Sequence, residues 1–209
     1  MSKLAQSIAG YDYVKVAENL AHKYLLHDLG KDKESFWSFH FHYHHKAAIK
    51  YGMLDPAYFE PWWLNASRAK EVLALFGAFL VHIPLALKYP YFVAGIGAGI
   101  GEYYYKHKKA HLDPEWALEH MRNHVLHHLH DQNKYWGVTS GAVDKILGTA
   151  PEISPEEWTK LRVFYMRRYN EMREEAEEIA QENIEEKQKN MKGSLERLTN
   201  QLYSFFERK

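Results

Sequence analysis

Apolar positions recur at helical spacing along most of this chain, and helix-ending residues separate the apolar runs. Residues 11–26 predict a helix that ends before Gly30. Residues 34–51 predict a second helix closed by Gly52, followed by a loop rich in proline and tryptophan over residues 55–63. We therefore expect an all-α fold.

The most apolar part of the chain lies between residues 72 and 101. Its two halves, VLALFGAFLVHIPLAL and YFVAGIGAGIG, are separated by Lys88-Tyr89-Pro90. Each half is shorter than the roughly 20 residues that a straight membrane-spanning helix needs. This pattern predicts a short apolar helical hairpin that dips into a bilayer, so the fold is expected to be a membrane-associated helical bundle. Buried core helices of a soluble protein are the alternative.

The glycines of this stretch, Gly95, Gly97, Gly99 and Gly101, stand two residues apart. Such spacing weakens a helix but lets a neighbouring helix approach closely. The glycines do not match the dinucleotide-binding pattern, because neither the helix start nor the charged partner of that pattern follows them.

The last quarter of the chain is polar and helical in pattern. Ser154-Pro155-Glu156-Glu157 predicts a helix start, with serine as N-cap and acidic residues in the first turn. A highly charged stretch follows over residues 171–192, and then an apolar stripe either lies on a membrane surface or packs against the body. The stripe contains Leu195, Leu198, Leu202, Phe205 and Phe206, with Arg197, Arg208 and Lys209 alongside. We divide the chain into a membrane domain, residues 1–150, and a charged helical C-terminal extension, residues 151–209.

Composition narrows the range of partners and chemistries. Among 209 residues, Lys plus Arg and Asp plus Glu both number 27, so no excess charge favours nucleic acid as a partner. The absence of cysteine excludes thiolate ligands, disulfides and a cysteine nucleophile. Residues 1–7 lead into a polar stretch, so we expect no secretory signal.

Histidine carries the candidate chemistry. Ten of the fourteen histidines fall into four clusters, and within a cluster most of them stand three or four residues apart, which places them on one helical face. The ten are His22, His27, His40, His44, His45, His107, His111, His124, His127 and His128. One ion accepts at most about six protein nitrogens, so ten converging imidazoles imply two ions. Imidazole binds both iron and zinc, and the choice between them stays open here.

The order of these clusters is similar to that of a known family. The segments are HKYLLH from His22, HFHYHH from His40, HKKAH from His107 and HVLHH from His124, and they are followed by NKYWGVTS and DKILGT. Over residues 15–150 this arrangement resembles the fatty acid hydroxylase and sterol desaturase superfamily, the histidine-box membrane di-iron oxygenases.

The resemblance implies a helical integral-membrane enzyme whose histidines hold two irons at the cytoplasmic face. Such an enzyme uses dioxygen to hydroxylate or desaturate a lipid C–H bond, and we expect hydroxylation here. Its implied partners are a lipid substrate, the membrane and an electron-donor protein of the cytochrome b5 or ferredoxin type. The ten histidines named above would be the metal ligands, with His42 as an alternative to His40.

Other assignments remain open. Imidazole ligands usually donate their second N–H to a carboxylate or carbonyl, and the acids near the clusters are candidates for that role. These acids are Glu18, Asp28, Glu102, Asp113, Glu119 and Asp131. The dipeptides His27-Asp28 and His130-Asp131 leave room for a metal-dependent HD-type hydrolase. A membrane protein that binds metal but catalyses no reaction is a further hypothesis.

Overall fold

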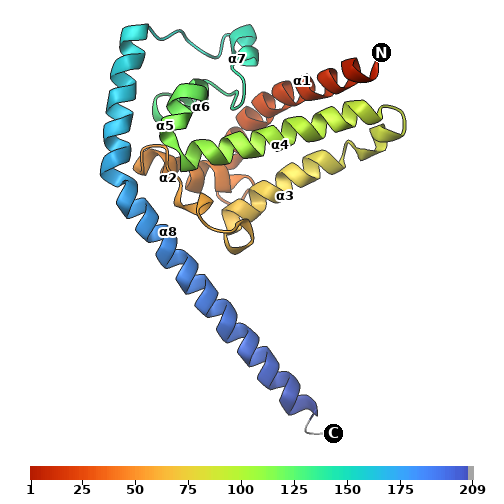
Figure 1. The fold of residues 1–209 in the computed structure, drawn as a ribbon, viewed down its shortest axis with the longest axis vertical. Helices are drawn as coiled ribbons and strands as arrows, with labels where there is room; N and C mark the ends of the chain where they lie inside the picture. Colours follow the sequence, from red (N-terminus) through yellow and green to blue (C-terminus); the bar gives the residue numbers. More distant parts are fainter. Residues whose placement is uncertain (207–209) are drawn as a thin grey trace.

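In the computed structural model, which describes residues 1–206, the chain is helical and this part of it contains no β-strand. The expected all-α fold is confirmed. A body of short helices carries an arm of three long ones, and the last helix runs along the body and then away from it (Figure 1). The elements are α1 (Lys3–Ala21), η1 (His22–Asp28), η2 (Leu29–Lys31), η3 (His40–His44), α2 (His45–Lys50), η4 (Pro56–Tyr58), η5 (Trp62–Leu64), α3 (Ala66–Leu80), η6 (Ile83–Leu87), α4 (Pro90–Leu112), α5 (Pro114–His120), α6 (Arg122–Leu129), α7 (Ala142–Leu147) and α8 (Pro155–Phe206).

The arm consists of α1, α3 with η6, and α4. The predicted apolar hairpin is formed by α3, η6 and α4, and Pro90 starts the returning helix as the sequence indicates. Helix α1 packs along α4 at backbone distance: a Cβ on Gly10 would lie 2.0 Å from the Phe92 carbonyl oxygen. A Cβ on Gly95 would likewise lie 2.1 Å from the Ser7 carbonyl oxygen. The predicted close approach at Gly95 is therefore made by α1.

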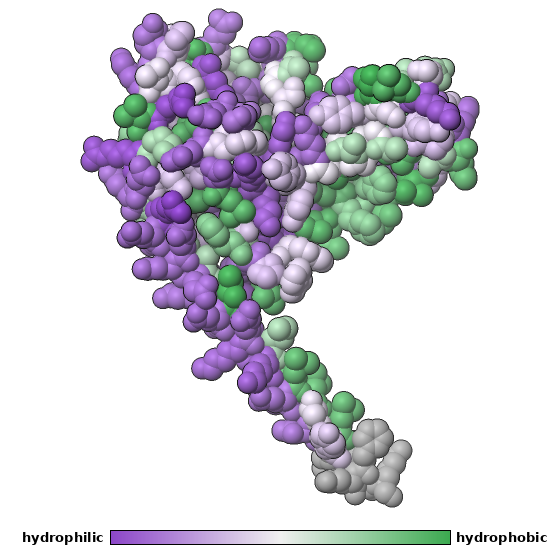
Figure 2. All heavy atoms as spheres, in the orientation of Figure 1, coloured by the Kyte–Doolittle hydropathy of each residue, from purple (hydrophilic) through white to green (hydrophobic). Residues whose placement is uncertain are grey.

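Apolar side chains cover much of the outside of the arm (Figure 2). Exposed members include Leu4, Ile8, Val16 and Leu20 on α1, and Leu73, Phe76 and Leu80 on α3. The first half of the hairpin is longer than its apolar pattern indicates: within residues 1–206, one helical segment, Ala66–Leu87, has 22 residues and is long and apolar enough to cross a membrane, with a mean hydropathy of 1.7. Only 6% of its most apolar window is buried, whereas a core helix of a soluble protein would be mostly buried.

The hydrophobic core of the body lies between α5, α6, the base of α4 and the first part of α8. Val125, Ala110 and Ala117 are fully buried there, and Tyr165 of α8 packs against them. A second, smaller cluster joins Tyr51 and Leu54 to α8 further along its length. These two hydrophobic clusters hold α2, α4 and α6 in place, and these three helices carry histidines of the site described below.

Helix α8 begins where the sequence predicts, with the Ser154 side chain accepting from the Glu157 backbone N–H at 3.1 Å. It continues without interruption to Phe206. Of the predicted apolar stripe, the side chains of Phe205 and Phe206 lie outside the described part of the chain, as do residues 207–209 with Arg208 and Lys209.

Candidate metal centre

The ten predicted histidines lie together in the body at the base of the arm, and the most exposed of them is only 5% accessible. Nine form two groups in which the imidazole nitrogens lie within 4.8 Å of one another. The first cluster is His22, His27, His40, His45 and His127; the second cluster is His44, His107, His111 and His128. His124 adjoins the second cluster, with its Nε2 2.9 Å from Nε2 of His111.

Two π-helical segments set the direction of the early histidines. In a π-helix the backbone N–H bonds to the carbonyl five residues earlier, so residues five apart take similar directions. In η3 the N–H of His45 donates to the carbonyl of His40, and both side chains enter the first cluster. His22 and His27 have the same spacing on η1 and enter that cluster too. His40 and His44, four residues apart, keep their ring centroids 5.1 Å apart, as their spacing predicts, but His44 belongs to the second cluster.

Adjacent histidines divide between the clusters. His44 and His45 follow one another in the chain but enter different groups, and so do His127 and His128 of α6. The ring centroids of His45 and His128 are only 4.2 Å apart, so the two clusters are neighbours. On α4, His107 and His111 share one face as predicted and both enter the second cluster.

Hydrogen bonds at Nδ1 orient five of the imidazoles. A carbonyl or carboxylate oxygen accepts, so in each case Nδ1 carries the proton and Nε2 keeps its lone pair. In the first cluster the acceptors are the carbonyls of Trp136, for His22, and Lys134, for His127, both at 2.7 Å. In the second cluster they are Asp55 for His44 at 2.7 Å, Met53 carbonyl for His111 at 2.7 Å and Glu71 for His107 at 2.9 Å.

Sequence reasoning missed both carboxylates that support the histidines. Among the described residues, none of the six acids predicted for this role is hydrogen-bonded to the ten histidines, and the carboxylates that are come from Asp55 and Glu71. Glu71 had a recognisable signal in the sequence, because it is the last acid before the apolar hairpin. Asp55 stands in the aromatic loop ten residues after His45 and gives no comparable signal.

Further residues hold these supports in place. Glu71 also accepts from the Tyr58 hydroxyl at 3.1 Å and pairs with the buried guanidinium of Arg68. Asp144 accepts from the backbone N–H groups of Trp136, at 2.9 Å, and Gly137, at 2.6 Å. Asp144 thereby fixes the turn whose carbonyl orients His22.

Burial makes the whole set neutral. Desolvation lowers the pKa of His22 to about 4, of His27 to about 2 and of His111 to about 3. The same cause holds the pKa of the other seven well below the usual value for histidine. Burial raises the pKa of Asp55 to about 7, while the backbone N–H of Ala57 and the positive charge of Arg68 favour its charged form. Neutral imidazoles with free lone pairs are the form that binds metals.

The spacing of the ring nitrogens fits coordination by an ion. Neighbouring Nε2 atoms of the first cluster lie 2.9 to 3.3 Å apart. For metal–nitrogen bonds of about 2.1 Å, adjacent ligands are about 3.0 Å apart in an octahedron and about 3.4 Å apart in a tetrahedron. In the second cluster, Nε2 of His44 and Nε2 of His107 are buried without a hydrogen-bond partner. A bound ion would give these lone pairs the partner that the protein does not provide.

The other four histidines lie elsewhere. His42 directs Nε2 to the carbonyl of Lys31 at 2.9 Å, so it is His40 that the fold brings into the cluster. His120 and His130 are exposed, and His82 sits near the tip of the arm. The two aspartates of the HD dipeptides also lie outside both clusters: Asp28 pairs with Lys31, and Asp131 caps the turn at Asn133.

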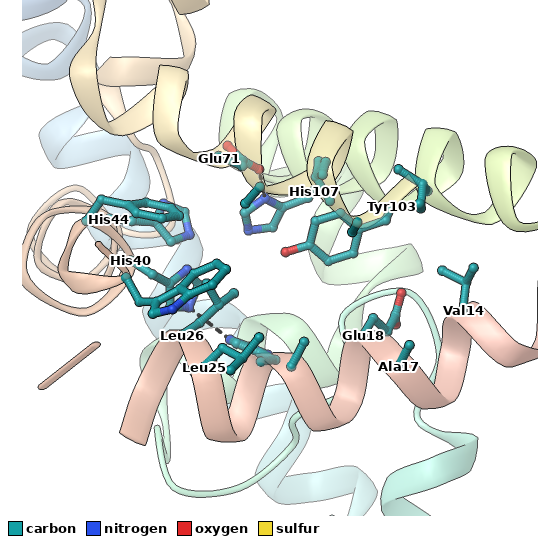
Figure 3. Close-up of a pocket in the computed structure, with 18 of the residues that line it drawn as sticks. Val14, Ala17, Glu18, Leu25, Leu26, His40, His44, Glu71, Tyr103 and His107 are labelled. Atoms are coloured by element: carbon teal, nitrogen blue, oxygen red, sulfur yellow. Dashed lines mark hydrogen bonds and ion pairs between the residues drawn. The ribbon is translucent and has the colours of Figure 1, made fainter. Parts of the chain in front are cut away.

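An apolar cavity of about 180 Å³ runs from the histidines into the arm, between α1, α3 and α4 (Figure 3). His22, His40, His44 and His107 line its inner end, so the cavity reaches both clusters. Small and aliphatic side chains such as Ala17, Ala74 and Ile100 form its walls. At the far end His82 lies 3.2 Å from the Tyr13 hydroxyl.

Comparison with protein-family models, with curated proteins and with solved structures finds no match to this chain. The assignment of a function therefore rests on the residues and on their geometry.

Proposed function

We propose that this protein is a membrane-bound di-iron oxygenase that uses dioxygen to hydroxylate a C–H bond of a lipid. One observation carries the proposal: two adjoining clusters of buried, neutral imidazoles lie at the inner end of an apolar cavity. The order of the four histidine segments, which resembles that of the fatty acid hydroxylase and sterol desaturase superfamily, supports the same function.

The number of donors favours iron over zinc. Protein zinc sites are almost always four-coordinate, and structural ones are closed tetrahedra. The first cluster offers five nitrogens, and the second offers four with His124 beside them. Sites with five or six ligands suit a metal of higher coordination number, and five nitrogens leave one position for an exogenous molecule.

When bound, the iron pair would supply dioxygen activation, the chemistry that a protein side chain cannot perform. In the overall reaction, R–H, dioxygen, two electrons and two protons give R–OH and water. The electrons come from outside the chain, and we propose a donor protein of the cytochrome b5 or ferredoxin type.

The residues of the chain position the substrate and exclude water. An apolar chain that enters between α1, α3 and α4 is guided by Ala17, Ala74 and Ile100 toward the histidines. The buried carboxylate of Glu71 and the carbonyl of Trp136 hold His107 and His22 in the tautomer that leaves Nε2 free. The apolar lining of the cavity suits a hydrocarbon chain.

The arm would place the cavity among lipids. Segment Ala66–Leu87 is long and apolar enough to span a bilayer, and its surface is exposed in the folded chain. We propose that α1, α3 and α4 insert together, so that a lipid chain passes from the bilayer into the cavity. The body with its histidines would then face the cytoplasm, where a donor protein can reach it.

Metal analysis joined to lipid profiling tests the proposal. The detergent-purified chain should contain close to two irons, and cells that express it aerobically should accumulate a hydroxylated lipid. His127→Ala should abolish the product, whereas His130→Ala, which changes an exposed histidine on the same segment, should not. One zinc per chain, or a lipid profile identical to that of cells without the protein, would contradict the proposal.

A further inference from the structure

The distal segment of α8, residues 188–206, extends away from the body (Figure 1). The last ion pair between α8 and the body joins Lys187 to the buried Glu60. The proposed oxygenase chemistry gives this segment no role.

Four side chains of the distal segment form an apolar face. Met191, Leu195, Leu198 and Leu202 are 49 to 60% exposed. Their spacing of four, three and four residues places them on one side of a helix. Figure 2 shows apolar residues of α8 along the side from which the arm also projects.

The charge of α8 reverses where it leaves the body. Residues 171–186 contain eight acidic side chains and one basic one, Arg173. Residues 187–203 contain four basic side chains, Lys187, Lys189, Lys192 and Arg197, and the single acid Glu196. The part of the helix that packs on the body would therefore be repelled by an anionic surface, and the distal segment would be attracted to it.

The basic residues stand where a membrane-surface helix needs them. At 100° per residue, Lys192 lies about 100° from Met191 on one side of the apolar face, and Arg197 lies about 120° away on the other. Long cationic side chains in such positions keep their charge at the lipid headgroups while the apolar face enters the acyl boundary.

We propose that the distal segment of α8 lies on an anionic lipid bilayer, with Leu195, Leu198 and Leu202 in the acyl boundary and the basic residues among the headgroups. Pairing with a second copy fits less well, because in a parallel coiled coil Lys192 would face Lys187 of the other helix. The contact of the distal segment with lipid does not require insertion of the arm. The proposed function enters only where the inserted arm sets how the body is oriented on the membrane.

Site-directed labelling tests this contact, and the lack of native cysteine makes single labels possible. Leu198→Cys and Asn200→Cys, on opposite sides of the helix, each carry an environment-sensitive fluorophore on the full-length chain in nanodiscs. In nanodiscs of phosphatidylcholine with phosphatidylglycerol, spin-labelled lipid should quench the label at position 198, and aqueous iodide should quench the label at position 200.

The charge contribution is tested separately. Because each basic residue near an anionic membrane contributes about fivefold in affinity, Lys192→Gln with Arg197→Gln should weaken the contact about 25-fold. Nanodiscs of phosphatidylcholine alone should weaken it at least as much. Lys160→Gln with Lys145→Gln, which changes two basic residues outside the distal segment, should leave the contact unchanged.

The outcomes separate this proposal from the proposed function. The surface contact would be overturned, even if the arm inserts, if iodide quenched the labels at positions 198 and 200 equally. It would also be overturned if quenching by spin-labelled lipid were the same with neutral and with anionic headgroups. Energy transfer between differently labelled chains at position 198, with no lipid quenching, would show self-association instead. A chain that fails to enter nanodiscs of phosphatidylcholine would count against the arm, whereas flotation of that same chain with anionic vesicles would still support the distal segment.

Discussion

The two histidine clusters use the same kind of ligand but support it differently. In the first cluster, the Nδ1 groups that make hydrogen bonds donate only to backbone carbonyls, those of Trp136 and Lys134. In the second cluster, two donate to carboxylates, Asp55 and Glu71. A carboxylate acceptor makes an imidazole a stronger electron donor to a metal than a carbonyl does. Equal ligand types therefore need not give equal sites, and we expect the second cluster to hold its ion more tightly.

The largest effect should come from two single variants, each of which removes one ligand from one of the clusters. His45→Ala and His44→Ala change adjacent residues that belong to the first and second clusters, respectively. Each variant should lower the metal content of the chain from two ions toward one and abolish product formation. His45→Ala keeps the second cluster intact and His44→Ala keeps the first. The ion that remains in His45→Ala should therefore stay bound at a lower concentration of free iron than the ion that remains in His44→Ala. Metal analysis at buffered iron concentrations measures this, and equal retention of iron by both variants would contradict the expected difference in affinity between the clusters.

A smaller effect is expected from the carboxylates alone. Asp55→Asn should weaken metal binding at the second cluster by about 10- to 100-fold and leave the first cluster unchanged, because its supports are backbone groups. Glu60→Gln serves as control, since Glu60 is equally buried but bonds to Asn65 and Lys187 rather than to a histidine. Glu71→Gln should act like Asp55→Asn but also leave the Arg68 charge unpaired, so its unfolding must be monitored in parallel. Loss of affinity at both clusters in Asp55→Asn would show that they do not act separately.

Filling the cavity should reduce turnover while both clusters keep their metal. Ala78→Phe places a ring in the wall that an apolar chain would follow, while the histidines stay in place. Displacement of a bound chain by even about 1 Å can lower the rate roughly 100-fold. Metal content should stay at the wild-type value. Gly77→Ala, where an added Cβ meets nothing within 4 Å, is the matched control on the same helix. Unchanged turnover in Ala78→Phe would contradict passage of the substrate through this cavity.

The smallest effect should come from His42. Nε2 of His42 donates a hydrogen bond to the carbonyl of Lys31, outside both clusters. His42→Ala should cost about 1 kcal/mol or less in the free energy of unfolding and leave both metals bound. Chemical denaturation and metal analysis check this together. If metal is lost from His42→Ala but not from His40→Ala, the assignment of His40 to the first cluster is wrong.

Much of the framework of this protein was predictable from local pattern. Helical spacing, the break at Pro90 and the Ser154 cap predict the hairpin and the start of α8, and the structure contains both. The ten histidines were also recognisable, because ten of the fourteen in the chain fall into four clusters. The arm was only partly predicted: α1 carries moderate hydropathy, and its place beside α4 depends on Gly10 and Gly95, which meet a partner distant in sequence.

The order of residues along the chain sets which groups the protein has available: ten imidazoles, an apolar hairpin and a charged terminal helix. The division of the imidazoles between the two clusters arises on folding, because π-helical turns at η1 and η3 have no reliable local signal and shift side-chain directions relative to an α-helix. Folding also decides that Asp55 and Glu71, rather than acids nearer in sequence, support the histidines. The physical reason is that a hydrogen bond to a buried imidazole is set by packing between segments that lie far apart along the chain.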